Sequence, residues 1–233
     1  IFEVNDQGQI GEGRTFDGLI FDGDDFVEVA NSDTLNFTEE LTLEAWVYAE
    51  TAGTHTIMSK GDNYSLTVDL EAGKWTHVVT LINFEQGVEQ VYANGSLVSD
   101  STFTPGENNL NDAPLLIGDS FTGKIDETRV YNRMITSAEV TEHQNSVFSS
   151  NKGIALYLPM NEQARDTASD LSGQNNHGAV NGALWGPSTS AEVTAVLSHT
   201  ETIGLTINPI NDQVVLDVPE DQQLFEDHKI RID

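Results

Sequence analysis

The chain has 233 residues, and 38% of them are hydrophobic, which is enough for one large β-sandwich or for one domain plus part of a second. Asp and Glu number 38 against 10 Lys and Arg, so the formal net charge is −28. This balance argues against nucleic-acid binding, which needs clustered cations to neutralise phosphates, and against an anionic membrane surface. The absence of cysteine excludes disulfides, zinc–thiolate sites and thiol catalysis.

Two interpretations of the acid excess stay open, and they are compatible. One is a highly soluble surface adapted to salty water. The other is that some carboxylates bind divalent cations, Ca²⁺ above all, as hard oxygen ligands. No apolar run approaches the ~20 residues of a membrane span, and no signal peptide opens the chain. We therefore expect an excised piece of a longer, exported bacterial protein.

Alternating apolar and polar residues predict several strands in the first half of the chain. In the strand at 41–48, Leu41, Leu43, Ala45 and Val47 share one face and Trp46 lies on the other. Further strands are predicted at 26–29, 57–60, 64–70 and 74–81. Asn94 and Gly95 are the strongest short-range hairpin signal, and they predict a hairpin over residues 90–98.

Residues 115–140 read as strand, turn, strand and short helix. The apolar run 115–117 stops at Gly118, and a turn follows at 121–124. Residues 125–132 then alternate, which predicts a regular strand with Ile125, Glu127, Arg129 and Tyr131 on one face. Residues 137–140 open a short polar helix. A strand of this kind needs a partner sheet, so the stretch implies an all-β sandwich.

These motifs occur in the order seen in LamG-like domains. The sequence resembles that family at F-D-G-D-D-x-V-E-V, T-x-E-A-W-V, G-x-W-T-H-V, V-Y-x-N-G-x-L-V and G-x-I-D-E-x-R-x-Y-N-R, over roughly residues 14–140. The resemblance implies a two-sheet antiparallel jelly roll of the concanavalin A-like lectin and glucanase superfamily. It also implies lectin-like binding as one of the functions that this fold carries.

Residues 153–185 resemble the first strand and loop of the same family, yet they follow the last strand instead of preceding the first. Three explanations remain: a circular permutation, a truncated second copy, or strand exchange between two chains. We favour permutation, because the strands expected next in a second copy are missing. The predicted domain therefore spans residues 1–190, with 153–185 supplying the permuted first strand.

Residues 191–233 differ in character. The stretch from Asn208 to Asp212, followed by Pro219, Glu220 and Asp221, resembles junctions between cadherin-like repeats of bacterial surface adhesins. The segment is too short for an independent sandwich. We expect linker strands and the start of a following repeat, with neighbouring repeats of the same long chain as partners.

Catalytic motifs are missing from the predicted strands. Glycoside hydrolases of this fold need two carboxylates beside the scissile bond, and Glu44 has no second carboxylate on its strand. Neither a zinc-protease helix motif nor a nucleophile elbow occurs. His77, beside Trp75, is expected to be a satisfied buried histidine. We therefore expect a binding protein and not an enzyme.

Two separate Ca²⁺ sites are expected, the first implied by the resemblance and the second indicated by the residues themselves. One is a ligand-binding site of the type found in pentraxins, which would use Asp62, Asn63 and Asp119. The other is structural, with Asp126 and the loop at Asp170 brought together by adjacent strands and with Glu162 and the turn at 22–25 as further ligands. For sugar binding, the aromatic candidates by residue type are Trp46, Tyr64, Trp75 and Tyr92. Tyr64 is expected to be exposed, whereas Trp46 and Trp75 are expected in the core.

The function expected from these residues is non-catalytic. It is a calcium-dependent, carbohydrate-binding module of a large bacterial cell-surface or secreted adhesin, with Asp62, Asn63 and Tyr64 contacting a glycan or other cell-surface ligand. Two alternatives stay open. One is a structural spacer domain in an extended adhesin array, and the other is an ancillary carbohydrate-binding module of a polysaccharide-degrading enzyme.

Overall fold

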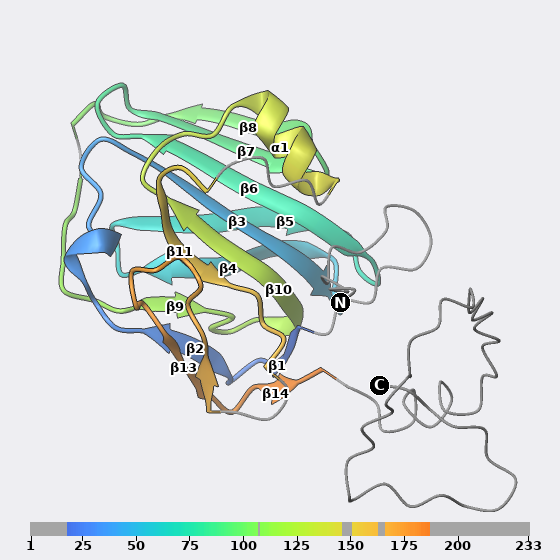
Figure 1. The fold of residues 1–233 in the computed structure, drawn as a ribbon. Coiled ribbons are helices and arrows are strands. Elements are labelled where there is room, and N and C mark those ends of the chain that lie inside the picture. Colours follow the sequence, from blue (N-terminus) through green and yellow to red (C-terminus); the bar gives the residue numbers. More distant parts are fainter. Residues whose placement is uncertain (1–17, 107, 146–150, 163–165, 187–233) are drawn as a thin grey trace, which may run out of the picture. The chain divides into compact units, whose positions relative to one another are not determined.

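The computed structural model describes residues 18–106, 108–145, 151–162 and 166–186, and these form two antiparallel sheets packed face to face (Figure 1). The predicted all-β jelly-roll sandwich is confirmed. The predicted repeat start at 191–233 lies outside the described residues. No helix in the described part of the chain is long and apolar enough to be a membrane span.

The larger sheet has eight strands, in the order β14-β1-β10-β3-β6-β7-β8, and β11 also pairs with β10. Its strands are β1 (Leu19–Asp22), β3 (Glu40–Ala49), β6 (Trp75–Asn83), β7 (Val88–Ala93), β8 (Ser96–Thr102), β10 (Thr122–Tyr131), β11 (Ile154–Leu158) and β14 (Leu184–Trp185). The smaller sheet has six strands, in the order β12-β13-β2-β9-β4-β5. These are β2 (Phe26–Val29), β4 (Gly53–Lys60), β5 (Tyr64–Leu70), β9 (Leu115–Ile117), β12 (Thr167–Ala168) and β13 (Gly178–Asn181).

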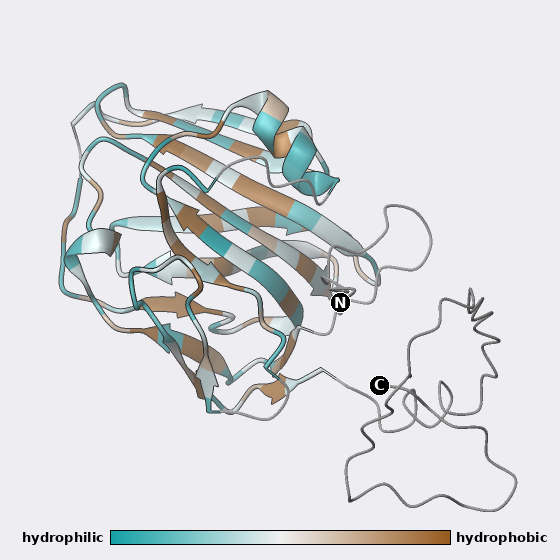
Figure 2. Cartoon of the chain, in the orientation of Figure 1, coloured by the Kyte–Doolittle hydropathy of each residue, from teal (hydrophilic) through white to brown (hydrophobic). Residues whose placement is uncertain are grey.

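Two helical segments accompany the sheets: a 3₁₀ turn η1 (Asp33–Leu35) and the helix α1 (Ser137–Gln144), which lies across the larger sheet (Figure 1). The core lies between the sheets, as alternation requires. Leu41, Leu43, Ala45 and Val47 of β3 are all fully buried against the smaller sheet. Figure 2 shows apolar residues alternating with polar ones along these strands. The predicted hairpin is confirmed as β7 and β8.

The late strands complete the same sandwich. β11 pairs with β10, β13 pairs with β2, and β14 pairs with β1. The partners of β13 and β14 thus precede them in the chain by more than a hundred residues. Pairing of this kind fits a permuted arrangement, and the permutation itself stays a prediction.

The regular alternation predicted for residues 125–132 is wrong, because a β-bulge interrupts β10. Ile125 pairs with Val47 and faces the core, but the register against β3 shifts between Asp126 and Arg129. Glu127 takes a left-handed backbone conformation (φ 54°). Arg129 therefore faces outward beside Glu44 instead of sharing the face of Ile125. A bulge re-aims the side chains that follow it, and here it turns a charged group out of the core.

We expect Gly118→Ala to destabilise the sandwich. A Cβ at Gly118 would lie 2.2 Å from the ring of Phe21, a buried core residue, and the backbone there has φ +81°. Overpacking costs roughly 1–3 kcal/mol, which for a domain of this size lowers Tm by about 5 °C. The matched control is Gly173→Ala, where φ is +87° but no atom lies within 4 Å. Equal melting temperatures of the two variants would contradict the packing argument.

Candidate functional site

The outer face of the larger sheet is organised in rows of cross-strand neighbours. From one end to the other, β10, β3 and β6 place side by side Tyr131–Thr42–Leu81, Arg129–Glu44–Val79, Asp126–Trp46–His77 and Lys124–Tyr48–Trp75. Directly paired residues point to the same face of a sheet. The rows therefore pass from an apolar end, through charged residues, to an aromatic end.

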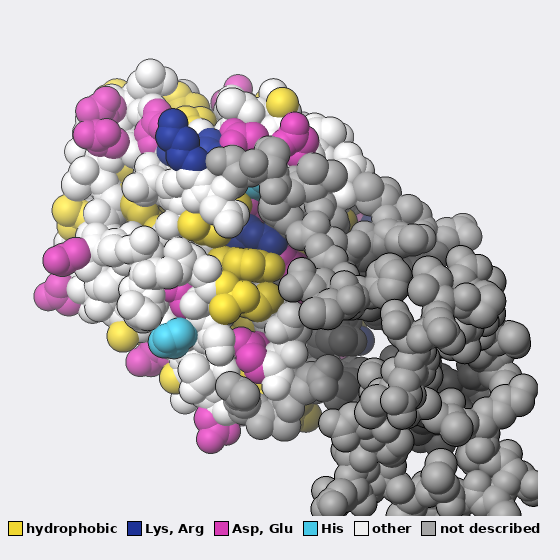
Figure 3. Space-filling model, in the orientation of Figure 1, with side chains coloured by type: hydrophobic (Ala, Val, Ile, Leu, Met, Phe, Trp, Pro, Cys, Tyr) yellow, Lys and Arg dark blue, Asp and Glu magenta, His cyan; other side chains and the backbone are white. Residues whose placement is uncertain are grey.

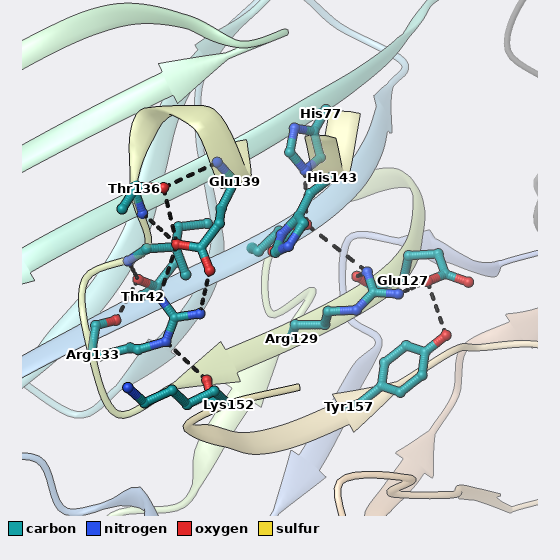
Figure 4. A network of polar contacts seen from close by, with 12 residues as sticks. Thr42, His77, Glu127, Arg129, Arg133, Thr136, Glu139, His143, Lys152 and Tyr157 are labelled. Atoms are coloured by element: carbon teal, nitrogen blue, oxygen red, sulfur yellow. Dashed lines mark hydrogen bonds and ion pairs between the residues drawn. The ribbon is translucent and has the colours of Figure 1, made fainter. Parts of the chain in front are cut away.

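Glu44 is the centre of the charged rows and is fully buried. Its Oε1 lies 2.9 Å from His77 Nε2, and its Oε2 lies 2.9 Å from His143 Nδ1, which belongs to α1. Arg129 Nη1 is 3.9 Å from Oε1. Figure 4 shows the two imidazoles and the guanidinium pointing toward one another from β6, α1 and β10. We call Glu44, His77, His143, Arg129 and Glu127 the Glu44 cluster.

Ionisation of Glu44 fixes the protons of the cluster. Burial disfavours the charged carboxylate, but the hydrogen bonds from His143 and His77 and the charge of Arg129 outweigh it and hold the pKa of Glu44 well below its usual range. An ionised carboxylate can only accept hydrogen bonds. His77 must then carry its proton on Nε2 and His143 on Nδ1, and both donate to Glu44.

Arg129 links the cluster to the late strand β11. Its Nη2 forms an ion pair with Glu127 Oε2, and its Nη1 donates to the carbonyl of Glu127 at 3.2 Å. The guanidinium lies 4.2 Å from the centre of the Tyr157 ring, and the hydroxyl of Tyr157 donates to Glu127 Oε2 at 3.1 Å. Two carboxylates and an aromatic face thus compensate a cation that is almost fully buried.

A second polar group docks α1 at the apolar end of the face (Figure 4). Arg133 makes a bidentate ion pair with Glu139, at 2.6 and 2.9 Å, and donates to the carbonyl of Lys152 at 2.9 Å. Thr136 and Glu139 form a reciprocal capping box at the start of α1. The hydrogen bond from Arg133 is the largest cause that lowers the pKa of Glu139, to about 2.

The opposite end of the face carries three aromatic side chains that are partly exposed: Trp46, Tyr48 and Trp75. We call them the aromatic patch. The rings of Tyr48 and Trp75 lie 5.8 Å apart, and the ring of Trp46 lies 5.2 Å from that of His77. His77 therefore touches the patch with its ring while its Nε2 binds Glu44. The prediction that Trp46 and Trp75 lie in the core is wrong, because both occupy outward positions of their strands.

The residues predicted for ligand binding lie elsewhere, in the turn between β4 and β5. Asp62 is exposed and accepts a hydrogen bond from Asn111 Nδ2 at 2.9 Å. The side-chain amide of Asn63 is buried and has no hydrogen-bond partner among the described residues. The fully buried Lys60 donates to the carbonyl of Asn111 at 2.6 Å. Lys60 and Asp62 are thus both hydrogen-bonded to Asn111, and the metal-binding and ligand-binding roles of Asp62 and Asn63 stay predictions.

The expected exposure of Tyr64 is wrong. Its side chain is 4% exposed, and its hydroxyl donates to the carbonyl of Leu35 at 3.0 Å. Tyr64 begins β5, where Leu66, Val68 and Leu70 all point into the core, and strand alternation gives Tyr64 the same direction. Tyr64 is therefore buried by the alternation of β5, although it directly follows an exposed turn.

Asp62 and Asp119 do not share a site. β4 and β9 are antiparallel, and Lys60 pairs with Leu115 whereas Met58 pairs with Ile117. The chain after β9 runs toward the start of β4, so Asp119 lies near the level of the middle of β4. Asp62 lies just after Lys60, the last residue of β4. About six residues of strand separate the two positions, which is roughly 20 Å at the rise of a β-strand.

Asp126 and Asp170 lie on opposite sides of β11. Asp126 is in β10, is 5% exposed, and accepts the backbone N–H of Glu127 at 2.8 Å. Asp170 accepts the backbone N–H of Tyr157, and the next residue donates to the carbonyl of Tyr157, so this loop borders the outer edge of β11.

The carboxylate of Asp170 organises its own loop. Besides Tyr157 N–H, its oxygens accept the backbone N–H and the hydroxyl of Ser172 and the backbone N–H of Asn176, all at 2.8–2.9 Å. A carboxylate offers about four acceptor positions, so protein donors fill them. The metal role stays a prediction for Asp126 and Asp170, and this hydrogen bonding weighs against it for Asp170.

Among the described residues, one acidic or histidine group has ligand atoms that all lie within 4.8 Å of one another: Asp22, Asp24 and Asp25, in the turn between β1 and β2. The hydrogen bond with Asp24 lowers the pKa of Asp22, and the same contact raises the pKa of Asp24. Burial raises the pKa of Asp25. The three carboxylates thus resist sharing the turn as three full charges.

The sequence alone did not predict that the residues of the Glu44 cluster lie in contact with one another. The expectation that His77 is a satisfied buried histidine is confirmed. In the sequence, Glu44 has no second carboxylate on its predicted strand, and no motif connects it with His143. One signal could have indicated the cluster. Glu44 is a charged residue at an outward position of its strand, and a histidine, His77, lies on the neighbouring strand β6.

Comparisons with known proteins agree with the fold. Residues 60–141 match the Laminin_G_3 family model, described as the concanavalin A-like lectin/glucanases superfamily. The match supports a concanavalin A-like domain. It includes β6 and β10, which supply His77, Arg129 and Glu127, and the first part of α1. No curated protein matches the chain.

Several solved structures are similar. A Bacteroides ovatus ATCC 8483 protein, described as a candidate carbohydrate-binding protein, is 20% identical with a TM-score of 0.55; the match covers 71% of this chain and 59% of that one. It shares the fold, and this chain spans about three fifths of its length. A heptameric pentraxin from Limulus polyphemus is 16% identical, with a TM-score of 0.48 and coverage of 75% and 97%. Domain 4 of the arabinanase AbnA from Geobacillus stearothermophilus, in complex with arabinotriose, is 22% identical, with a TM-score of 0.42 and coverage of 53% and 74%.

We expect Glu44→Gln to lower Tm by about 10 °C at neutral pH, because two hydrogen bonds to a buried charge, each worth roughly 1.5–3 kcal/mol, are weakened. The pKa of Glu44 is depressed in the folded state, so its stabilisation is complete above the unfolded value of about 4.3 and is lost as the pH falls below it. The difference in Tm between wild type and variant should therefore shrink from pH 7 to pH 3.

The control for this prediction is Glu28→Gln, which changes an exposed carboxylate on β2. Its melting temperature should stay within about 1 °C of wild type, as is usual for surface positions. A difference between wild type and Glu44→Gln that grows toward acid would contradict the assignment of the ionised state to Glu44.

Proposed function

We propose that this domain is a non-catalytic carbohydrate-binding module whose ligand stacks on the aromatic patch. The observation that carries the proposal is the placement of Trp46, Tyr48 and Trp75 together at the open end of the larger sheet. Aromatic rings bury large apolar areas with few rotatable bonds, and they suit the apolar faces of sugar rings. The likeness in fold to the Bacteroides ovatus protein adds support.

The Glu44 cluster gives this patch a rigid base. His77 contacts Trp46 with its ring and is held in turn by Glu44, which is itself held by α1 through His143. A preorganised surface loses less conformational entropy when a ligand binds. The buried acid and histidines are therefore structural in this proposal: they face one another at zero or near-zero exposure and present no reacting group to a substrate.

We also propose that the module belongs to a bacterial cell-surface or secreted adhesin, which is the setting expected from the sequence. Figure 3 shows acidic side chains spread over the face that is drawn and not gathered in one patch. Dispersed charge of this kind keeps a protein soluble. It suits a module that works outside the cell in salty water.

The test is glycan binding by the aromatic variants. We expect Trp75→Ala to lower the affinity for a glycan bound by the wild type at least tenfold, since large aromatic anchors dominate binding surfaces. The melting temperature should change little, because Trp75 is partly exposed. The control Leu97→Ala removes a side chain that is 47% exposed on the edge strand β8, away from the patch. A wild-type protein that binds no member of a broad glycan array would favour a structural spacer instead.

We further propose that Ca²⁺ stabilises the domain, as expected from the sequence. The acid excess supplies hard oxygen donors, and the carboxylates of Asp22, Asp24 and Asp25 are the described group close enough to share an ion. The hydrogen bond with Asp22, followed by repulsion from Asp22 and Asp25, raises the pKa of Asp24, and a divalent cation would take the place of the shared proton and relieve this repulsion.

Melting in EDTA and in millimolar CaCl₂ at fixed high ionic strength checks this proposal. We expect Ca²⁺ to raise Tm by several degrees, as a ligand specific for the native state does, with a much smaller effect of MgCl₂. Asp24→Asn should remove the increase, and Asp33→Asn, an exposed carboxylate in η1, should keep it. Equal melting temperatures in EDTA and CaCl₂ would eliminate the calcium requirement.

A further inference from the structure

The row that Tyr48 and Trp75 begin continues across the sheet into the strands at its other edge. Tyr48 pairs with Lys124 of β10, Lys124 with Ile20 of β1, and Ile20 with Leu184 of β14. Ile20 is partly exposed and Leu184 is 67% exposed, whereas their neighbours Leu19 and Trp185 point to the core side. A line of outward side chains therefore crosses five strands.

Lys124 interrupts this line with a positive charge. Its Nζ lies 5.7 Å from the centre of the Tyr48 ring, at a distance typical of a cation over an aromatic face. The aromatic and aliphatic side chains on either side of it cannot neutralise the ammonium. A ligand lying along the row would pass directly over this charge.

Four other cationic side chains among the described residues have partners within the protein. Arg129 pairs with Glu127 and Arg133 pairs with Glu139. Lys74 lies 2.5 Å from Glu71, and Lys60 is buried against the Asn111 carbonyl. Lys124 has no carboxylate partner in these interactions, although the chain has 38 acidic residues to supply one. A cation that has no carboxylate partner and lies over the ring of Tyr48 is complementary to an anion brought by the ligand.

We infer that the glycan recognised on this face is acidic, with a carboxylate or sulfate group that binds Lys124 while flanking sugar rings stack on Tyr48 and Trp75. This inference rests on the proposed carbohydrate-binding function and specifies its ligand class. Strands lie about 4.8 Å apart, so five of them span roughly 19 Å, which suits a chain of several sugar units and not a single one.

The net charge of −28 affects this recognition. A polyanionic glycan is repelled by the protein as a whole, and salt screens that repulsion within about 8 Å at 0.15 M and about 3 Å at 1 M. The contact between the ligand's anionic group and Lys124 is shorter than either length, so salt weakens this attraction less than it weakens the repulsion. Binding of an acidic glycan is therefore expected to tolerate high salt, in contrast to ordinary charge-driven binding.

The test uses a glycan array with uronate-bearing, sulfated and neutral members, followed by titration calorimetry in 0.5 M NaCl. We expect acidic members to dominate the array. For the best uronate oligosaccharide, its methyl ester should bind at least tenfold more weakly to the wild type. Lys124→Met should lose this preference, so that acid and ester bind it equally, while the affinity for the ester stays at its wild-type value.

The control variant is Lys74→Met, which removes the same charge from a lysine that already pairs with Glu71 and should keep the preference for the acid. Circular dichroism and Tm establish that both variants fold. Binding of neutral glycans only, or an acid preference that survives in Lys124→Met, would overturn the inference and leave the proposed function standing. Binding of no glycan at all would overturn both.

Discussion

The outer face of the larger sheet depends on one buried carboxylate. Glu44 loses its hydration completely and is retained only because three elements bring it hydrogen-bond donors or positive charge: β6 through His77, α1 through His143 and β10 through Arg129. Breaking such an arrangement costs more than forming it gains, because a buried charge left without partners has no water to return to. The cluster therefore specifies where α1 lies and how β10 is bulged.

The position of the cluster divides the face. On one side, Val79, Leu81, Tyr131, Ile135 and Val140 pack into an apolar group beneath α1. On the other side the sheet stays partly open, and the aromatic patch occupies it. Without the bulge in β10, Arg129 would point toward the core and Glu44 would face two histidines alone. A local irregularity in one strand thus separates the half covered by α1 from the half where the aromatic side chains are partly exposed.

Much of the fold followed from sequence patterns, and much of the site did not. Alternation in 41–48 and 74–81, the Asn94–Gly95 hairpin and the polar start of α1 are local signals, and each corresponds to an element of the structure. The phase of residues 125–132 failed because a bulge costs little locally and leaves no marker in an alternating pattern. Asp62 and Asp119 seemed suited to one site by motif, but their separation is set by the register of β4 against β9, which neither segment encodes alone.

The Glu44 cluster is the clearest example of this limit. The motifs around Glu44, His77 and Arg129 identified the fold one by one, and their convergence appeared only when three strands lay side by side. His143 had no motif of its own, and its role depends on the angle at which α1 crosses the sheet. Sequence patterns report what each segment is. They do not report which side chains of distant segments meet.

The state of the two imidazoles tests this account most directly. Proton-detected ¹⁵N spectroscopy of the histidine side chains at neutral pH should show a proton on His77 Nε2 and on His143 Nδ1, both slow to exchange with water because they are buried and bound to Glu44. Both signals should disappear or shift strongly in Glu44→Gln. Protons on the opposite nitrogens, or rapid exchange at both sites in the wild type, would contradict the claim that Glu44 organises this face.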